Sequence, residues 1–314
     1  MLTIGVIYPH DEIETDRSAV REYAQAVEAM GYSHVVAYDH VLGANTASRP
    51  DWKGPYKLET KFHEPLVLFS FMAGATHKLG FFTGILILPQ RQAVLVAKQA
   101  ASLDVLCEGR LRVGVGTGWN EVEYEALGFS YAGRGERLEE QVEVMRKLWT
   151  QPAVTIRTPG HTITDAGINP LPVQRPIPVW MGGGADRGRW NSPASMKVIR
   201  RIARMADGWF PLWDLGRKNS EDLWTPNERA YELLALCHGF CREYGRDPAT
   251  LGIEGRLDAR RSDESRLAES IKAWQSIGAS HLSINTMGDG LKGVAHHLRR
   301  LEQLRPLITP AAGA

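Results

Sequence analysis

Cysteine is scarce in this 314-residue sequence, which contains only Cys107, Cys237 and Cys241. Three thiols cannot form a disulfide framework, and no Cys-x-x-Cys pair is available to bind a metal ion. Cys237 and Cys241 lie four residues apart in a predicted helix, where we expect both to be buried as small apolar residues. The sequence therefore excludes the disulfide-rich class of protein.

The motifs of two other kinds of catalytic site are also missing. No Gly-x-Ser-x-Gly is present, so the nucleophile elbow of the α/β-hydrolases is absent. A hydrolytic metal centre would gather several His and carboxylate ligands at strand ends. Four histidines of the first 80 residues form no ligand pair on one predicted strand; they are His10, His40, His63 and His77. His296 and His297 are neighbours in a predicted helix and so face different ways, which favours solvent exposure over a site.

Excess charge and long apolar segments are missing too. Lys plus Arg number 37 and Asp plus Glu number 36, a formal net charge of +1, so neither nucleic acid nor an anionic membrane is indicated as a partner. No segment approaches the ~20 apolar residues of a membrane span. The N-terminal sequence MLTIGVIYPHDE has no basic region and too short an apolar run for a signal peptide. We therefore expect a soluble, cytoplasmic protein.

The central stretch of the chain, residues 79–120, predicts a βαβ unit. An apolar strand, Leu79 to Leu88, precedes a helix with apolar residues at three- and four-residue spacing, and Leu111 to Val115 is a second strand. The crossover should be right-handed and the two strands parallel. The second strand leads directly into Gly116-Thr117-Gly118-Trp119, at the carboxyl end, where parallel α/β folds place their ligands.

The whole sequence alternates strands and helices in this way. The eight expected strands begin at Leu2, His34, Leu79, Leu111, Val179, Gly208, Leu251 and His281. This alternation predicts an α/β protein in which residues 1–314 form one domain, a single (β/α)8 TIM barrel, with a doubly wound sheet as the alternative. Insertions are expected after strand two, at residues 42–61, and before strand five, where residues 152–178 contain a small hairpin.

In such a barrel the residues that follow each strand carry the chemistry. Glycine clusters follow the fourth and fifth strands, at residues 116–118 and 182–184. Their backbone N–H groups would let a phosphate approach closely, although glycine is also common in ordinary loops. Asp39 and His40 follow strand two. His40 could exchange protons near neutral pH, or the pair could be a turn cap and a surface residue, and position alone leaves both interpretations open.

Five stretches resemble the luciferase-like family of flavin and deazaflavin oxidoreductases, in that family's order. They are YDHV at 38–41, TGILILPQRQAVLVAKQAASLDVLCEGRLRVGVGTGWN at 83–120, RGERLEEQVEVMRKLW at 134–149, PVQRPIPVWMGGG at 172–184 and ADGWFP at 206–211. The resemblance covers nearly all of the chain. It implies a (β/α)8 barrel with its cofactor at the carboxyl face, often in a homodimer. The branch to which the chain is most similar uses the deazaflavin coenzyme F420.

The resemblance also implies roles for individual residues. Asp39 would contact the cofactor, and His40 would lie beside the reacting ring face as a catalytic proton donor. The other cofactor-binding positions that it implies are Gly84, Ile85, Thr117, Gly118, Asn120, Gly182, Gly183 and Gly184. The last three would lie near the phosphate. A non-prolyl cis peptide is expected between Gly84 and Ile85, at a bulge in strand three, with the Ile85 side chain pressing on the cofactor ring.

Two positions bear on the choice of cofactor and substrate. Thr117 stands where the FMN-using members tend to carry an Arg for the FMN phosphate, which favours F420 and leaves FMN as the alternative. Trp119 stands where the glucose-6-phosphate dehydrogenase members have a catalytic Glu, which removes the evidence for sugar-phosphate dehydrogenation. Aromatic side chains that would suit either an apolar substrate pocket or the core are Trp52, Tyr56, Trp119 and Trp213.

The expected function is therefore hydride transfer between F420 and a small organic substrate, which the sequence does not name. An FMN-dependent two-component monooxygenase of the same fold is one alternative. A barrel that binds a flavin without turnover is an alternative from another class. In either enzyme the cofactor would supply the difficult chemistry, and the protein would supply orientation, proton transfer and exclusion of water.

Overall fold

A computed structural model of the protein describes residues 2–184, 192–212, 225–226, 228–259 and 264–307. The chain divides into two compact units. The first unit comprises residues 1–36, 78–80 and 180–314, and the second comprises residues 37–77 and 81–179.

Parallel strands form the centre of the first unit. These strands are β1 (Thr3–Ile7), the start of β2 (His34–Ala37), β8 (Val179–Gly184), β9 (Gly208–Leu212), β10 (Gly252–Asp258) and β11 (His281–Asn285). They neighbour one another in the order β2-β1-β11-β10-β9-β8, and each of these pairings is parallel. Val6 of β1, for example, lies opposite Ile284 on one side and Val35 on the other. Continuous apolar segments such as the buried β2 suit strands that are covered on both faces.

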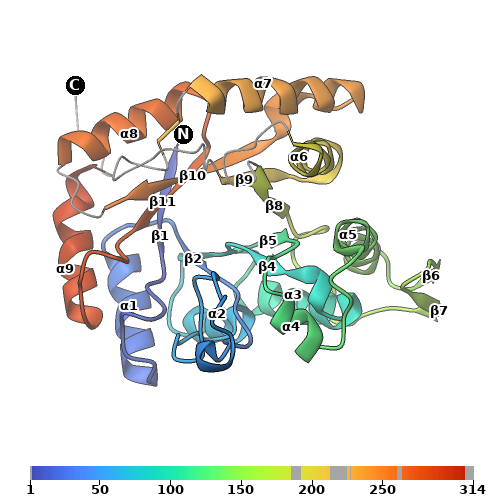
Figure 1. The fold of residues 1–314 in the computed structure, drawn as a ribbon, viewed down its shortest axis with the longest axis horizontal. Coiled ribbons are helices and arrows are strands. Elements are labelled where there is room, and N and C mark those ends of the chain that lie inside the picture. Colours follow the sequence, from blue (N-terminus) through green and yellow to red (C-terminus); the bar gives the residue numbers. More distant parts are fainter. Residues whose placement is uncertain (1, 185–191, 213–224, 227, 260–263, 308–314) are drawn as a thin grey trace. The chain divides into compact units, whose positions relative to one another are not determined.

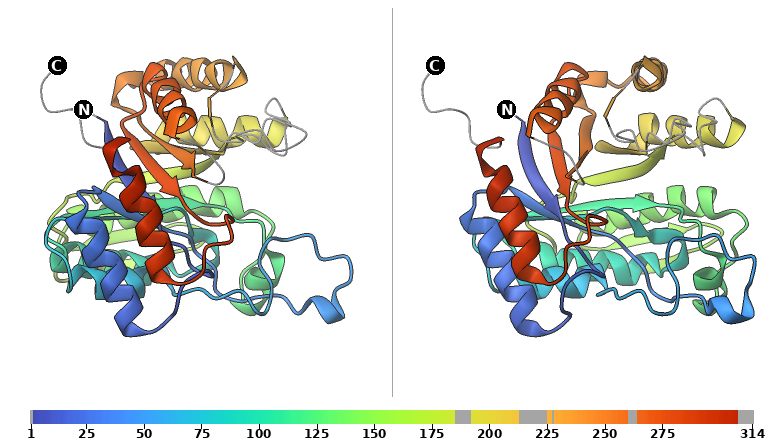
Figure 2. Two further views of the ribbon diagram at one scale, coloured as in Figure 1. Left: turned by 90° about the vertical axis from the view of Figure 1, so that its left-hand side faces the viewer. Right: turned by 60° about the vertical axis from the view of Figure 1, so that its left-hand side comes forward.

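Helices follow these strands along the chain. They are α1 (Arg17–Ala29), α6 (Pro193–Met205), α7 (Glu228–Glu243), α8 (Glu264–Ser276) and α9 (Val294–Leu304), with short 3₁₀ helices η3 (Pro248–Thr250) and η4 (Arg305–Leu307). Helix α1 begins where the Asp16 carboxylate accepts a hydrogen bond from the Ser18 N–H at 2.8 Å. It ends before Gly31, which has a φ of +87°. Helices α1 and α9 lie side by side (Figure 2).

The second unit contains the central βαβ stretch. Strands β3 (Gly80–Thr83) and β4 (Leu86–Ile87) both pair in parallel with β5 (Leu111–Gly116). The peptide bond between Gly84 and Ile85 is cis, as predicted, and it separates β3 from β4. The one long strand expected at residues 79–88 is therefore two short ones.

The helices of the second unit cover these strands (Figure 1). They are α2 (Pro65–Ala73), α3 (Ala93–Leu106), α4 (Glu121–Ala126) and α5 (Arg134–Thr150), with 3₁₀ helices η1 (Thr46–Ser48) and η2 (Leu88–Gln90). Helix α5 buries one apolar face, and its Trp149 indole N–H donates to the Ala97 carbonyl of α3 at 2.9 Å.

Both predicted insertions are present. The segment after β2 carries η1 and extends as a blue loop away from the strands of the second unit (Figure 2). The antiparallel hairpin of β6 (Val154–Arg157) and β7 (Thr162–Ala166) projects beyond α5 (Figure 1). Eight strand positions alternate with helices, and the described pairings other than this hairpin are parallel. This is the arrangement of a (β/α)8 barrel, so the predicted fold class is confirmed.

Several smaller expectations have definite outcomes. Cys237 and Cys241 are buried in α7, as predicted. The expectation that His296 and His297 are both exposed is half wrong, because His297 is fully buried while His296 is exposed. Helix α9 packs against the unit along the face that carries His297. Among the residues that the structure describes, no helix is long and apolar enough to cross a membrane.

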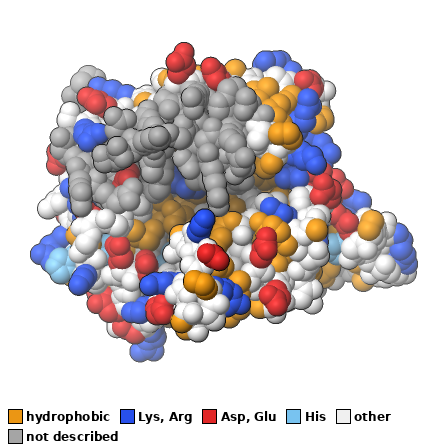
Figure 3. Space-filling model, in the orientation of Figure 1, with side chains coloured by type: hydrophobic (Ala, Val, Ile, Leu, Met, Phe, Trp, Pro, Cys, Tyr) orange, Lys and Arg blue, Asp and Glu red, His pale blue; other side chains and the backbone are white. Residues whose placement is uncertain are grey.

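Charged side chains show no segregation by sign on the visible surface. On the face drawn in Figure 3, Lys and Arg side chains are interspersed with Asp and Glu side chains across the described part of the chain. This distribution agrees with the near-zero net charge, and it gives no large field of one sign on that face.

Candidate active site

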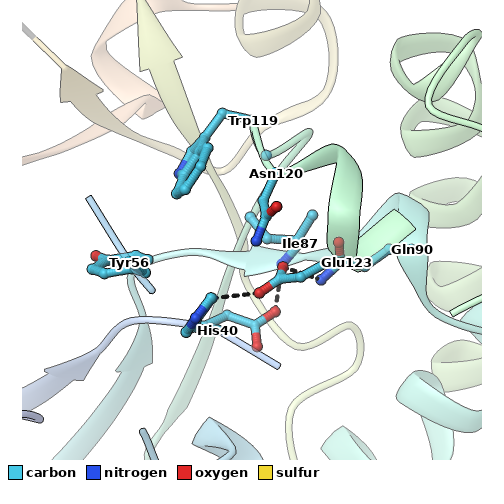
Figure 4. A pocket seen from close by; sticks show the side chains of 9 residues that line it. His40, Tyr56, Ile87, Gln90, Trp119, Asn120 and Glu123 are labelled. Carbon is cyan, nitrogen blue, oxygen red and sulfur yellow. Dashed lines mark hydrogen bonds and ion pairs between the residues drawn. The ribbon is translucent and has the colours of Figure 1, made fainter. Parts of the chain in front are cut away.

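A pocket in the second unit lies between the end of β2, the turn after β4 and the residues that follow β5. Its lining consists of Asp39, His40, Tyr56, Ile87, Gln90, Gly118, Trp119, Asn120 and Glu123 (Figure 4). Four of the predicted site residues, Asp39, His40, Gly118 and Asn120, are thus brought together. Three others in this unit, Gly84, Ile85 and Thr117, are not part of the lining.

His40 is fixed on several sides. Its side chain is only 4% exposed, and its Nδ1 is in ion-pair contact with Oε1 of Glu123. Two rings from the segment after β2 pack against the imidazole, with the ring centre of Tyr56 at 4.9 Å and that of Phe62 at 5.1 Å. Nε2 is buried and has no hydrogen-bond partner among the described residues. An imidazole held at one nitrogen and free at the other can take up or release a proton at the free one.

Glu123 comes from the short helix α4 and was not predicted from the sequence. Besides His40, its Oε1 accepts the Val41 N–H at 2.9 Å and the Leu42 N–H at 3.3 Å. Its Oε2 accepts from the Gln90 amide at 3.0 Å. Burial would raise the pKa of Glu123, but the hydrogen bonds from His40, Gln90 and Val41, together with the charge of His40, hold this pKa below its ordinary value. The carboxylate is therefore ionised at neutral pH.

Asp39 is the second carboxylate of the pocket, and its side chain is fully buried. Oδ2 accepts the Ile87 N–H at 2.8 Å, and Oδ1 pairs with Nη2 of Arg91 at 2.7 Å. Arg91 in turn binds Glu64 through Nη1 at 3.0 Å. Both oxygens of Asp39 thus contact the protein itself, and the cofactor contact expected of Asp39 stays a prediction.

The glycine-rich turn after β5 supplies the opposite side of the pocket. Gly118 has a φ of +62°, and a Cβ there would lie 2.7 Å from Cγ2 of Ile87, so a larger residue would not fit. Asn120 begins α4, because its Oδ1 accepts the Val122 N–H at 3.2 Å. The carbonyl of Thr117 accepts a hydrogen bond from the Tyr124 hydroxyl at 2.8 Å.

The predicted phosphate-binding glycines belong to the first unit. Gly182, Gly183 and Gly184 form the end of β8. Gly183 and Gly184 have φ values of +127° and +149°, a conformation that favours glycine. The Gly183 carbonyl accepts a hydrogen bond from the Trp209 indole N–H at 2.7 Å. Their role at a phosphate stays a prediction.

The aromatic residues proposed for a substrate pocket have different outcomes. Tyr56 and Trp119 line the pocket, and 42% of Trp119 is exposed. Trp52 packs against Trp119 with ring centres 5.7 Å apart, and its indole N–H donates to the Tyr56 carbonyl at 3.1 Å. Trp213 lies outside the described residues.

The sequence did not predict the polar residues that hold Asp39 and His40 in place. These are Gln90, Arg91 and Glu123. A weak signal was available for the last, because Glu121, Glu123 and Glu125 alternate in the segment after the glycine turn. Nothing in that pattern tells which of the three glutamates faces inward. Among the described residues, no group of three or more His, Cys, Asp or Glu side chains could hold a metal ion.

A buried imidazole and two buried carboxylates line one pocket beyond the ends of parallel strands, which is where (β/α)8 barrels place their sites. The family follows from comparison with known proteins. Residues 3–306 match the model of the luciferase-like monooxygenase family, and the chain belongs to that family. Members of the family are flavin- or deazaflavin-dependent oxidoreductases.

Each of three curated relatives matches part of this chain. An uncharacterized protein of Mycobacterium tuberculosis is 35% identical over 209 residues, 65% of this chain and 68% of the relative. The F420-dependent hydroxymycolic acid dehydrogenase of M. tuberculosis is 26% identical over 277 residues, 87% of this chain and 66% of the relative. The FMNH2-dependent dimethylsulfone monooxygenase of Pseudomonas putida is 33% identical over 151 residues, 47% of this chain and 39% of the relative.

Solved structures share the fold at low sequence identity. The monooxygenase RslO1 from Streptomyces bottropensis has a TM-score of 0.74 at 14% identity, over 98% of both chains. An F420-dependent secondary alcohol dehydrogenase, solved with an F420–acetone adduct, has a TM-score of 0.73 at 17% identity, over 98% of this chain and 99% of the other. Likeness at this level of identity establishes the barrel and leaves the cofactor open.

Proposed function

We propose that this protein transfers a hydride between coenzyme F420 and a small organic substrate, with His40 as the residue that exchanges the accompanying proton. The observation that carries the proposal is the buried His40 side chain, which lines the pocket and has an Nε2 without a partner among the described residues. The relative whose name includes F420 matches 87% of the chain, which supports the deazaflavin over FMN.

The residues that we propose to hold the cofactor are Asp39, Gly84, Ile85, Thr117, Gly118 and Asn120 in the second unit and Gly182, Gly183 and Gly184 in the first. Asp39, Gly118 and Asn120 of these line the pocket. When bound, a deazaflavin donates or accepts the hydride. His40 takes up or releases a proton at Nε2, while the rings of Tyr56 and Phe62, which pack against the imidazole, limit the access of water to it. The orphaned Nε2 is the group that a ligand in this pocket would use.

A second candidate is an FMN-dependent monooxygenase. The specific observation in its favour is the relative named for FMNH2, which is 33% identical over its matched part. Against it stands Thr117, because FMN-using members tend to place an Arg there for the phosphate. The same pocket would then serve oxygen chemistry in place of hydride transfer to or from an organic substrate.

The two candidates are separated by binding. We predict that the apoprotein binds F420 at least tenfold more tightly than FMN, a difference of roughly 1.4 kcal/mol. Titration of each cofactor by fluorescence or calorimetry measures this ratio directly. Thr117→Arg is the matched variant, and it should narrow the ratio by strengthening FMN binding. Equal or reversed affinities in the wild type would defeat the deazaflavin assignment and leave the family unaffected.

A further inference from the structure

We infer that Glu123 is the positioning residue of His40. When the imidazole is neutral, contact with this carboxylate places its proton on Nδ1 and leaves Nε2, which has no partner among the described residues, as the proton acceptor. The inference rests on the proposed function in one respect, because it is His40 that the proposal gives the proton-exchanging role. It adds Glu123 to the residues of the proposed site and defines which nitrogen of His40 carries the proton.

The Glu123 carboxylate cannot turn away from His40. Its Oε1 receives the N–H groups of Val41 and Leu42, and its Oε2 receives the amide of Gln90. The side chain is 3% exposed, so water does not compete for these positions. In Figure 4, Glu123 reaches from α4 towards both His40 and Gln90, with the imidazole approaching from the end of β2. Three elements therefore hold one carboxylate oxygen against Nδ1.

The chemistry of the ring follows from this contact. An ionised carboxylate is an acceptor only, so Nδ1 must carry the hydrogen for the contact to be favourable. The neutral imidazole is then protonated at Nδ1, and the lone pair lies on Nε2. If Nε2 takes a proton from a substrate whose hydride would be accepted by oxidised F420, the imidazolium that forms is balanced by Glu123, which itself stays ionised. The substrate gains one double bond, and the reverse steps reduce it.

Asp39 does not position the His40 imidazole. It lies next to His40 in the chain and lines the same pocket, but its two oxygens are bound by Ile87 and Arg91. Tyr56 contacts the imidazole through its ring. Of the two carboxylates in the pocket, Glu123 is thus the one in contact with His40.

The tautomer of His40 can be read directly by ¹⁵N NMR of the ligand-free protein labelled at histidine, with His40→Gln to assign the signals. Spectra are recorded at the highest pH at which the fold is kept, so that the ring is neutral. We expect the wild type to show the Nδ1–H form in at least about tenfold excess over the Nε2–H form. An Nε2–H form, or an even mixture, in the wild type would overturn the inference without recourse to any variant.

Variants of Glu123 complete the test. Glu123→Met removes the acceptor and should bring the Nε2–H form to at least half of the population. Glu123→Gln keeps an acceptor oxygen and should retain the Nδ1–H form. Glu125→Gln, an exposed residue of the same helix, is the control and should leave the spectrum unchanged. An unchanged tautomer in a folded Glu123→Met protein would contradict the inference. The readout needs no cofactor, so a failure to bind F420 would reject the proposed function separately.

Discussion

Two buried carboxylates lie in one pocket, and their partners differ in kind. Asp39 is neutralised by Arg91, a permanent cation, at 2.7 Å. Glu123 is paired with His40, an imidazole and not a permanent cation. A buried charge without a partner is costly, so both carboxylates need these neighbours. Of these two pairs, only Glu123–His40 lacks a permanent cation, so we assign the proposed proton chemistry to that side of the pocket.

His40→Ala tests this division at the level of one side chain. We expect turnover to fall by about 10²–10⁴-fold, because the group that exchanges the proton is removed. The affinity for cofactor should change far less. Steady-state kinetics with F420 and a cofactor titration on the same preparation measure the two effects.

His296→Ala is the matched control, because that histidine is exposed on α9. It should leave both quantities unchanged. Normal turnover in His40→Ala would demote His40 to a residue of the pocket wall and would favour a barrel that binds the cofactor without using His40. Loss of cofactor binding would make His40 a binding residue instead.

Single residues also mark where sequence reasoning stops. Asp39 and His40 could be picked out because both follow a strand directly, and that position is local in the chain. Glu123 lies 82 residues from Val41, whose N–H it accepts, and only packing brings the two together. Gln90 and Arg91 follow a buried strand as ordinary polar residues. Their orientation is decided by the turn after β4, which the sequence pattern does not specify.

At the scale of secondary-structure elements, Arg91 joins three of them. Through Asp39 it holds the residues after β2, and through Glu64 it holds the first turn of α2. Glu64 also caps that helix by accepting the Val67 N–H at 2.8 Å. The turn that carries Arg91 follows β4, so one guanidinium connects this turn to the residues after β2 and to the start of α2.

Arg91→Met should therefore destabilise the protein by about 3 kcal/mol, because it leaves the fully buried Asp39 carboxylate without its cation. Urea unfolding followed by circular dichroism gives the change in midpoint. Arg200→Met removes an exposed ion pair with Glu243 of similar length, 3.0 Å, and should leave the midpoint nearly unchanged. Equal effects of the two substitutions would show that the Arg91–Asp39 pair is no more important than a surface contact.

The elements themselves were largely predictable. Strands such as β1 and β2 are short, mostly apolar runs, and long helices such as α5 bury one apolar face, so local sequence patterns suffice to predict the alternation. The break between β3 and β4 was expected from the family resemblance and not from the apolar pattern, which runs unbroken to Leu88. Helix α4 was not predicted, because six residues with three glutamates show no apolar face.

At the scale of the whole molecule, a buried histidine in the first unit sets part of the response to acid. The side chain of His297 is fully buried in α9, with Nδ1 2.8 Å from the Thr286 hydroxyl. Burial, and secondarily the neighbouring His296, lowers the pKa of His297 to about 4, although Glu14 opposes the shift. Glu123 in the second unit also has a lowered pKa, and its effect is confined to more acidic solution.

The sign of the effect follows from proton binding. In the unfolded chain the His297 imidazole binds a proton near its ordinary pKa of 6.5, whereas in the folded protein it does so only near 4. Between these values the unfolded state binds more protons, so the free energy of unfolding falls as the pH is lowered through this window. The loss between pH 7 and pH 5 should be on the order of 2 kcal/mol from His297. Glu123 adds a loss of the same sign only below its ordinary pKa of 4.5.

Urea unfolding at a series of pH values from 7.5 to 5 tests this prediction, with His297→Gln as the variant that cannot titrate. The variant should be less stable than the wild type at pH 7.5, because it loses the packing of the imidazole. Its stability should nevertheless change much less with pH, so the two curves converge towards pH 5. His296→Gln, on the exposed side of the same helix, should keep most of the slope of the wild type, because burial is the larger cause of the lowered His297 pKa. A slope in His297→Gln as steep as that of the wild type would show that other groups cause the acid sensitivity.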